Sequence, residues 1–159
     1  MKLRYALAVA SLLAAASIAQ AATGFQGILS GGNEVPTNPS AGTGVATVIL
    51  NTAGDAFTYE VTYSGLTGTV TASHIHQAPA GTNGSVIFGF SPPLGTTSGS
   101  FSGGPVAMTP TQAANLIAGL YYVNIHTTVY PGGELRAQLE GAPTASGKST
   151  WGRIKKLYR

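Results

Sequence analysis

The three histidines of the chain stand in two short motifs, His74-Ile75-His76 and the Asn-Ile-His-Thr segment at 124–127. Side chains alternate between the two faces of an extended strand, so His74 and His76 project from one face, about 6–7 Å apart at Cα. Two imidazoles in that arrangement can clamp a metal ion, and His126 supplies a third nitrogen if the two motifs lie on neighbouring strands. The spacing therefore predicts a metal site made by His74, His76 and His126.

Imidazole nitrogens suit copper, zinc, iron and nickel, and three histidines with an open coordination position are typical of catalytic metal sites. The chain has no cysteine, so thiolate ligands are excluded. Copper is the first expectation for the metal, and zinc is the alternative. Candidates for holding the imidazole rings from outside the coordination shell are Glu34, Asn124, Glu134 and Tyr122. For Glu34, a fourth ligand and a cap for backbone N–H groups are equally good predictions.

Arg136 is the one lysine or arginine between positions 22 and 142. It follows Glu134 by two positions, so both side chains are predicted on one face of the last strand. One interpretation makes Arg136 a guide that draws a small anion toward the metal, while Glu134 holds a histidine. The alternative is a local salt bridge, which contributes little to stability where it is exposed.

Two interpretations of the histidines without a metal stay open. In one, the imidazoles hydrogen-bond to loop carbonyl groups and brace the fold. In the other, they bind a partner molecule directly. A nucleophilic enzyme is disfavoured, because the chain has neither a cysteine nor a Gly-x-Ser-x-Gly motif.

Short strands separated by turns run through most of the chain. The clearest alternation of a half-buried strand lies at 57–63, and the segments 44–50 and 57–63 are predicted to pair as an antiparallel hairpin. Further strands are expected at 24–29, 70–76, 85–90, 97–102, 121–127 and 134–139. This pattern predicts an all-β fold, an antiparallel Greek-key-like sandwich or barrel.

One short helix is expected among the strands. Thr109 is a suitable N-cap, Pro110 suits the first helical position, and Gln112 completes a capping box. Gly119 is the expected stop. The apolar face of this helix is predicted to consist of Ala113, Leu116, Ile117 and Leu120.

The two ends differ in composition from the middle. Residues 1–21 combine two basic residues, an apolar run and an Ala-x-Ala motif, which predicts a secretory signal peptide and export to a periplasm or beyond. Residues 22–142 form the predicted domain and carry five acids against one base, a net charge of −4. Nucleic acid is not an expected partner of such a domain. The tail at 143–159 carries five bases, which predicts either contact with an anionic membrane or envelope polymer, or a flexible solubilising segment.

Six motifs in this order resemble the CHRD domain family, named from chordin and found in many bacterial secreted proteins. They are LSGGNEVP at 29–36, YSGL at 63–66, SHIHQAP at 73–79, GTNG at 81–84, LIAGLYYVNIHT at 116–127 and YPGGELR at 130–136. The resemblance runs from about 24 to 140. The chain departs from the usual family pattern at Thr37, Gln77 and Ala137, none of which is a candidate ligand.

The histidine spacing also resembles the copper site of copper/zinc superoxide dismutases, in which a His-x-His strand, a further histidine strand and a late arginine occur in this order. The residues of the dismutase zinc site have no counterpart here. This likeness implies a redox activity toward superoxide or a related small oxidant. The alternative from a different class is a non-catalytic extracellular module that binds a protein or glycan. The redox hypothesis requires all three imidazoles on one face of the sheet.

Overall fold

The computed structural model describes residues 22–141, so the predicted signal peptide and basic tail lie outside the described residues. Half of the described chain is strand, and the predicted hairpin is present as β2 and β3. The elements in chain order are β1 (Thr23–Ser30), the 3-10 helix η1 (Gly31–Asn33), β2 (Thr43–Leu50), β3 (Ala56–Ser64), β4 (Val70–Gln77), β5 (Ser85–Gly89), β6 (Gly99–Ala107), α1 (Pro110–Ile117), β7 (Tyr121–Thr127), β8 (Leu135–Gln138) and β9 (Glu140–Gly141).

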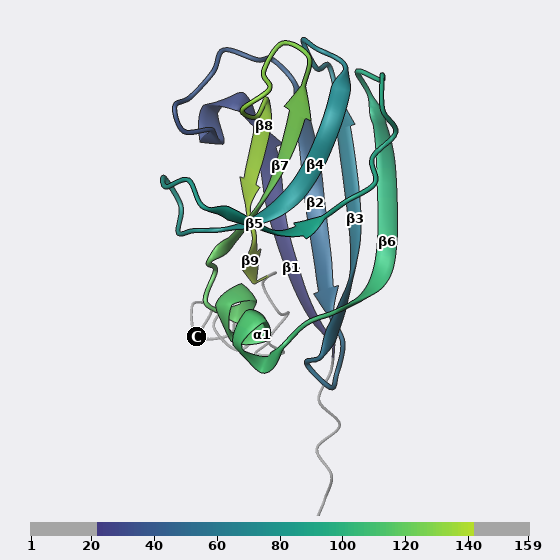
Figure 1. The fold of residues 1–159 in the computed structure, drawn as a ribbon, viewed down its shortest axis with the longest axis vertical. Helices are drawn as coiled ribbons and strands as arrows, with labels where there is room; N and C mark the ends of the chain where they lie inside the picture. Colours follow the sequence, from purple (N-terminus) through teal and green to yellow (C-terminus); the bar gives the residue numbers. More distant parts are fainter. Residues whose placement is uncertain (1–21, 142–159) are drawn as a thin grey trace, which may run out of the picture.

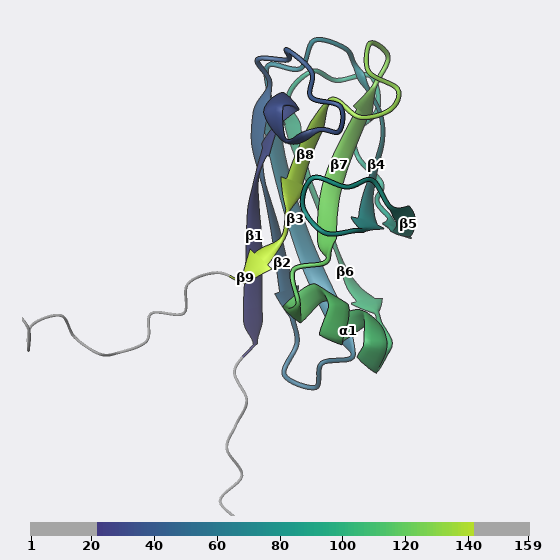
Figure 2. The ribbon, with the colours of Figure 1, turned by 90° about the vertical axis from the view of Figure 1, so that its left-hand side faces the viewer.

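The strands form one antiparallel sheet in the order β5-β4-β7-β8-β1-β2-β3-β6, and β9 pairs with β1. This sheet curls into a half-barrel, so that β4, β7 and β8 face β1, β2 and β3 across the core (Figures 1 and 2). The predicted all-β antiparallel fold with one helix is confirmed. β6 begins two residues later and ends five residues later than the strand expected at 97–102.

Alternation along the strands fills the inside of the curl with apolar side chains. Aromatic contacts join β3 to β5, which lies at the opposite edge of the sheet: the ring centroids of Phe57 and Phe88 are 5.0 Å apart, and Tyr59 stacks on Phe90, just after β5, at 4.0 Å. Side chains rather than ladder hydrogen bonds therefore close this side of the half-barrel. Fully buried members of the core include Phe25, Leu29, Val48, Phe57, Ile75, Val123, Ile125, Leu135 and Leu139.

α1 lies across one end of the half-barrel (Figure 1). Its start is the predicted capping box, in which Thr109 accepts from the backbone of Gln112 and the Gln112 side chain accepts from the backbone of Thr109. Ala113 and Leu116 are buried, whereas Ile117 is 63 % exposed. The apolar face of the helix is therefore narrower than the sequence predicts, because a two-turn helix over a barrel end contacts it along one line.

We expect Phe88→Ala to lower the free energy of unfolding by about 2 kcal/mol, because a half-buried aromatic ring and its edge contact with Phe57 are lost. Val86 on the same strand is 51 % exposed, so Val86→Ala is the matched control, with an expected change within about 0.5 kcal/mol. Denaturant unfolding of the two variants measures the difference. Equal losses would show that the aromatic contacts do not hold β5 to β3.

Candidate metal centre

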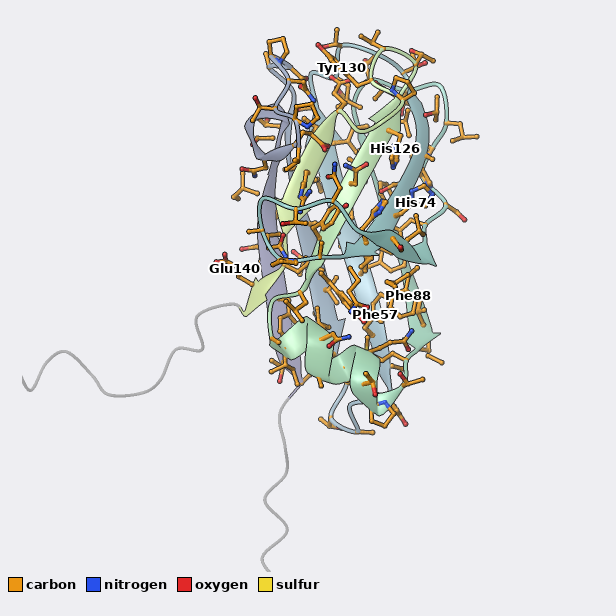
Figure 3. The ribbon with its side chains drawn as sticks, turned by 60° about the vertical axis from the view of Figure 1, so that its left-hand side comes forward. Phe57, His74, Phe88, His126, Tyr130 and Glu140 are labelled. Carbon is orange, nitrogen blue, oxygen red and sulfur yellow. The ribbon has the colours of Figure 1, made fainter. Side chains whose placement is uncertain are left out.

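The register between β4 and β7 brings the three histidines to one face of the sheet. His74 lies opposite Asn124, and Ala72 lies opposite His126. Residues directly opposite one another project to the same side, and so do residues two positions apart on one strand. The imidazoles of His74, His76 and His126 therefore share the outer face, while Ile75 is buried in the core. Figure 3 shows His74 and His126 near one another where β4 and β7 run together.

The three imidazoles converge on one point. His74 Nδ1 lies 3.1 Å from His126 Nε2, and one nitrogen from each of the three histidines lies within 4.8 Å of the others. Two nitrogens bound to one tetrahedral metal ion at 2.0–2.1 Å are about 3.3 Å apart, close to the distance seen here. All three side chains are partly exposed, so the face of the site away from the sheet is open to small molecules.

Loop carbonyl groups fix the orientation of two rings. His126 Nδ1 donates to the carbonyl of Pro131 at 2.9 Å, and His76 Nδ1 donates to the carbonyl of Gly84 at 3.0 Å. Because a carbonyl group can only accept, the proton of each neutral ring is on Nδ1 and the lone pair is on Nε2. A ring that donates one N–H to an acceptor and leaves the other nitrogen free is the usual arrangement of a metal-binding histidine.

His76 Nε2 is buried and has no hydrogen-bond partner. A buried nitrogen without a partner costs free energy, and such atoms are rare in folded proteins. A metal ion shared with the neighbouring imidazoles would satisfy this lone pair. The donor set of three nitrogens, with one of them orphaned, therefore fits a copper or zinc ion.

The electrostatic surroundings keep two of the rings neutral. Burial lowers the pKa of His74, and the nearby His126 and His76 rings lower it further. Burial also lowers the pKa of His76, against a raising effect of the hydrogen bond to Gly84. Only neutral imidazole can bind a metal. The two shifts therefore extend the pH range in which His74 and His76 can bind one to values somewhat below the usual pKa of histidine.

His76 lies at the end of a stack of three planar groups. Its ring stacks on Tyr122 with a centroid distance of 4.9 Å and an angle of 8°, and the guanidinium carbon of Arg136 lies 3.4 Å from the centroid of the Tyr122 ring. The backbone N–H of Gly84 donates to the Tyr122 hydroxyl at 3.2 Å. Gly84 thus contacts both His76 and Tyr122. A Cβ at this position would lie 1.8 Å from the carbonyl oxygen of Gln77, so only glycine fits.

Arg136 does not have the geometry of an exposed anion guide. It is 1 % exposed, and its guanidinium donates to Thr82 O at 2.7 Å and to Asn83 Oδ1 at 3.1 Å in the loop between β4 and β5. That loop crosses in front of β7 and β8 (Figure 2). The guanidinium is therefore covered by the loop, and its position favours orienting Tyr122 and the loop over contact with an incoming anion.

Glu134 is separated from both Arg136 and the histidines. It lies in the bend before β8, where its carboxylate accepts hydrogen bonds from Ser40, Thr127 and the backbone of Thr67 and Gly68. Burial by itself would raise the pKa of Glu134, but these bonds lower it below its usual value. The prediction that Glu134 and Arg136 share a face fails because the strand geometry begins only at Leu135. The hydrogen bonds of Glu134 join the segments at Ser40, at 67–68 and at the end of β7.

Glu34 and Asn124 form a buried pair beside the histidines. Asn124 Nδ2 donates to Glu34 Oε1 at 2.7 Å, and both residues are buried. The pair packs against Gly133, whose φ is +136° and where a Cβ would lie 2.4 Å from Asn124 Nδ2. Neither side chain hydrogen-bonds to an imidazole. Glu34 therefore accepts from a side chain, instead of the predicted metal ligation or backbone capping.

Burial raises the pKa of Glu34 to about 7, against lowering effects of the Arg136 charge and of the hydrogen bond from Asn124. The carboxylate is thus unfavourable in the folded protein. Near neutral pH, Glu34 exchanges between its protonated and ionised forms.

The model of the CHRD domain family matches residues 25–139. The chain belongs to the CHRD domain family. Every residue of the site lies within the matched range, so the site is part of the CHRD domain itself. No curated protein and no solved structure matches the chain. The likeness to copper/zinc superoxide dismutases rests on the order of the histidines and the arginine, and a likeness of that kind does not establish an activity.

The sequence identifies the side chains of the CHRD domain site more readily than the groups that orient them. Tyr122 is among the residues expected to hold a ring, and it stacks on His76. The hydrogen bonds of His76 and His126 to Gly84 O and Pro131 O are the loop-carbonyl contacts of the bracing interpretation. The sequence does not show which carbonyl groups make them, because every residue carries one. The glycines and proline at 130–133 and 81–84 do signal tight turns, which is the one available indication that backbone groups approach the histidines there.

We expect Glu34→Gln to stabilise the CHRD domain at high pH. A folded-state pKa raised from 4.5 to about 7 means that the folded protein binds the proton more tightly, so the wild type loses stability as the pH rises from 4.5 through about 7. Glutamine avoids the buried charge and can still accept from Asn124. The gain should be about 1–2 kcal/mol at pH 8.5, with allowance for solvent screening, and should shrink as the pH falls toward 5.

Thermal unfolding of both proteins at pH 8.5 and pH 5 measures this gain. The two proteins differ at this one side chain, so the effects of all other groups cancel in the comparison. A difference that stays the same at the two pH values would contradict a buried, titrating Glu34.

Proposed function

We propose that this CHRD domain protein binds one copper ion through His74, His76 and His126. The observation that carries the proposal is the convergence of three imidazole nitrogens on one face, with the buried Nε2 of His76 lacking any other partner. The lowered pKa values of His74 and His76 and the carbonyl groups that hold two of the rings also support it. Zinc is the alternative ion, because imidazole suits both metals.

A copper ion held by three imidazoles with an open position can exchange one electron with a small oxidant, and superoxide is the oxidant that we propose. The protein contributes three imidazole nitrogens, an orientation of two rings set by Gly84 and Pro131, and a partly exposed face. The ring of Tyr122 covers one face of the His76 ring. Glu34 lies one hydrogen bond from Asn124, which is opposite His74 in the sheet, so a titrating proton is held close to the site.

We also infer that the protein acts outside the cytoplasm. The signal-peptide pattern of residues 1–21 supports this, together with the family, whose domains are typically extracellular. Among the described residues, no helix has the length and apolar character that crossing a membrane requires.

We expect the protein beginning at Ala22 to bind one copper ion per chain. His76→Ala should bind it at least about 100-fold more weakly, because losing even an outer partner of a metal ligand costs about 10- to 100-fold in affinity. Isothermal titration with copper, and separately with zinc, measures both quantities. Gln77→Ala is the matched control, because Gln77 follows His76 on β4 and its exposed side chain projects to the other face.

Two results of the titrations would contradict this prediction. If the wild type binds neither ion at micromolar concentration, the metal site is refuted, and the histidines brace the loops of an extracellular interaction module. If Gln77→Ala loses copper as fully as His76→Ala does, the loss comes from distortion of β4 and not from a missing ligand.

We expect the copper-loaded wild type to accelerate the loss of superoxide, and His126→Ala to lose at least 90 % of that activity, because removing one of three ligands weakens the binding of the metal. Pulse radiolysis or a competition assay measures the rate per chain at equal protein and equal total copper concentrations. A wild type that binds copper tightly without accelerating the reaction would be a copper carrier.

A further inference from the structure

The stack of Arg136, Tyr122 and His76 places a permanent positive charge next to the proposed metal site. The guanidinium carbon lies 3.4 Å from the centre of the Tyr122 ring, and the Tyr122 and His76 rings are 4.9 Å apart and nearly parallel. The charge is thus separated from a ligand ring by one aromatic side chain. No water fits between groups at these distances, so bulk solvent screens this charge little along the stack.

The arginine is held rigidly and its charge is not neutralised by its hydrogen-bond partners. Thr82 O and Asn83 Oδ1 accept from it, and both are neutral groups. Arg136 is 1 % exposed and Tyr122 is 3 % exposed. The Arg136 charge acts on the carboxyl group of Glu34. Because burial raises the pKa of Glu34 to about 7, the negative charge of its carboxylate offsets the guanidinium charge only in part at neutral pH.

A fixed positive charge disfavours an ion of higher charge more than one of lower charge. We propose that Arg136, acting through Tyr122 and His76, is a positioning residue that shifts the bound copper from Cu(II) toward Cu(I). This inference rests on the proposed copper site and adds a control of its oxidation state. For unit charges about 8–10 Å apart at an effective dielectric constant of about 20, Coulomb's law gives a shift of about ten- to thirtyfold in the ratio of the two affinities.

The same stack explains why a tyrosine can lie against a redox-active ligand. A cation over its ring makes removal of an electron from Tyr122 less favourable, since the oxidised ring would itself be positive. Its hydroxyl accepts from the Gly84 N–H, and this bond offers no base to take the phenol proton. Tyr122 is therefore suited to transmit the field of Arg136 without being oxidised.

The test measures the affinities of the protein beginning at Ala22 for Cu(I) and for Cu(II), each by competition with a chelator of known affinity. In Arg136→Met, which keeps an apolar side chain over Tyr122 but removes the charge, the preference for Cu(I) should fall about ten- to thirtyfold. For a one-electron couple, each tenfold change lowers the potential by about 59 mV. Arg136→Lys, which keeps a charge, should retain most of the wild-type ratio.

Gln138→Met is the matched control. Gln138 lies two positions from Arg136 on β8 and also holds the loop between β4 and β5, through Ala78 O at 3.0 Å, but it carries no charge. It should leave the affinity ratio unchanged. Circular dichroism confirms that each variant is folded, and Arg136→Gln replaces Arg136→Met with the same expected shift if the methionine variant does not fold.

The outcomes separate the two proposals. If the wild type binds neither form of copper, the proposed function fails and this inference fails with it. If the wild type and Arg136→Met bind both ions with the same ratio, the copper site stands and the role of Arg136 is refuted. An equal shift in Gln138→Met would also refute it, because the shift would then come from the loop and not from the charge.

Discussion

Antiparallel pairing of β4 with β7 sets His74 opposite Asn124 and Ala72 opposite His126, and the candidate site depends on this register. A slip of one residue would turn His126 into the core, because adjacent positions on a strand face opposite sides. The register is fixed from the inside of the half-barrel. Ile75, Val123 and Ile125 are buried there, and moving any of them to the outer face would expose apolar surface.

The outer face of β4, β7 and β8 is polar, yet loops cover much of it. Arg136, Asn124 and Glu34 are all buried on this side of the sheet, each with a hydrogen-bond partner from another element. Leaving a buried polar group without a partner costs free energy, so the bonds that these side chains make favour the loop positions seen here. The molecule therefore has an apolar core inside the curl and a second, polar layer outside it, and the histidines lie in the second layer.

The sequence predicts the strands well because their apolar and polar residues alternate, and it predicts which faces the histidines share. It fails where the chain leaves the strand geometry. Glu134 looks like a neighbour of Arg136 at a spacing of two, but the bend before Leu135 sends its carboxylate to Ser40 and Thr127. It also fails for Arg136, since the spacing cannot show that a loop 53 positions earlier in the chain will cover the guanidinium. Both errors concern contacts with segments distant in the chain, which no local pattern encodes.

The closure of the half-barrel by aromatic rings leaves one edge near the candidate site without a backbone ladder. β5 has a backbone ladder only with β4, and its opposite edge meets β3 through side chains such as Phe88 and Phe57. The half-barrel can therefore part at this edge without breaking a ladder between strands, and transient opening usually begins where such ladders are missing. Gly84, which holds His76, immediately precedes β5. Movement at this edge would shift Gly84, and with it the hydrogen bond that orients His76, while β4 and β7 stay paired.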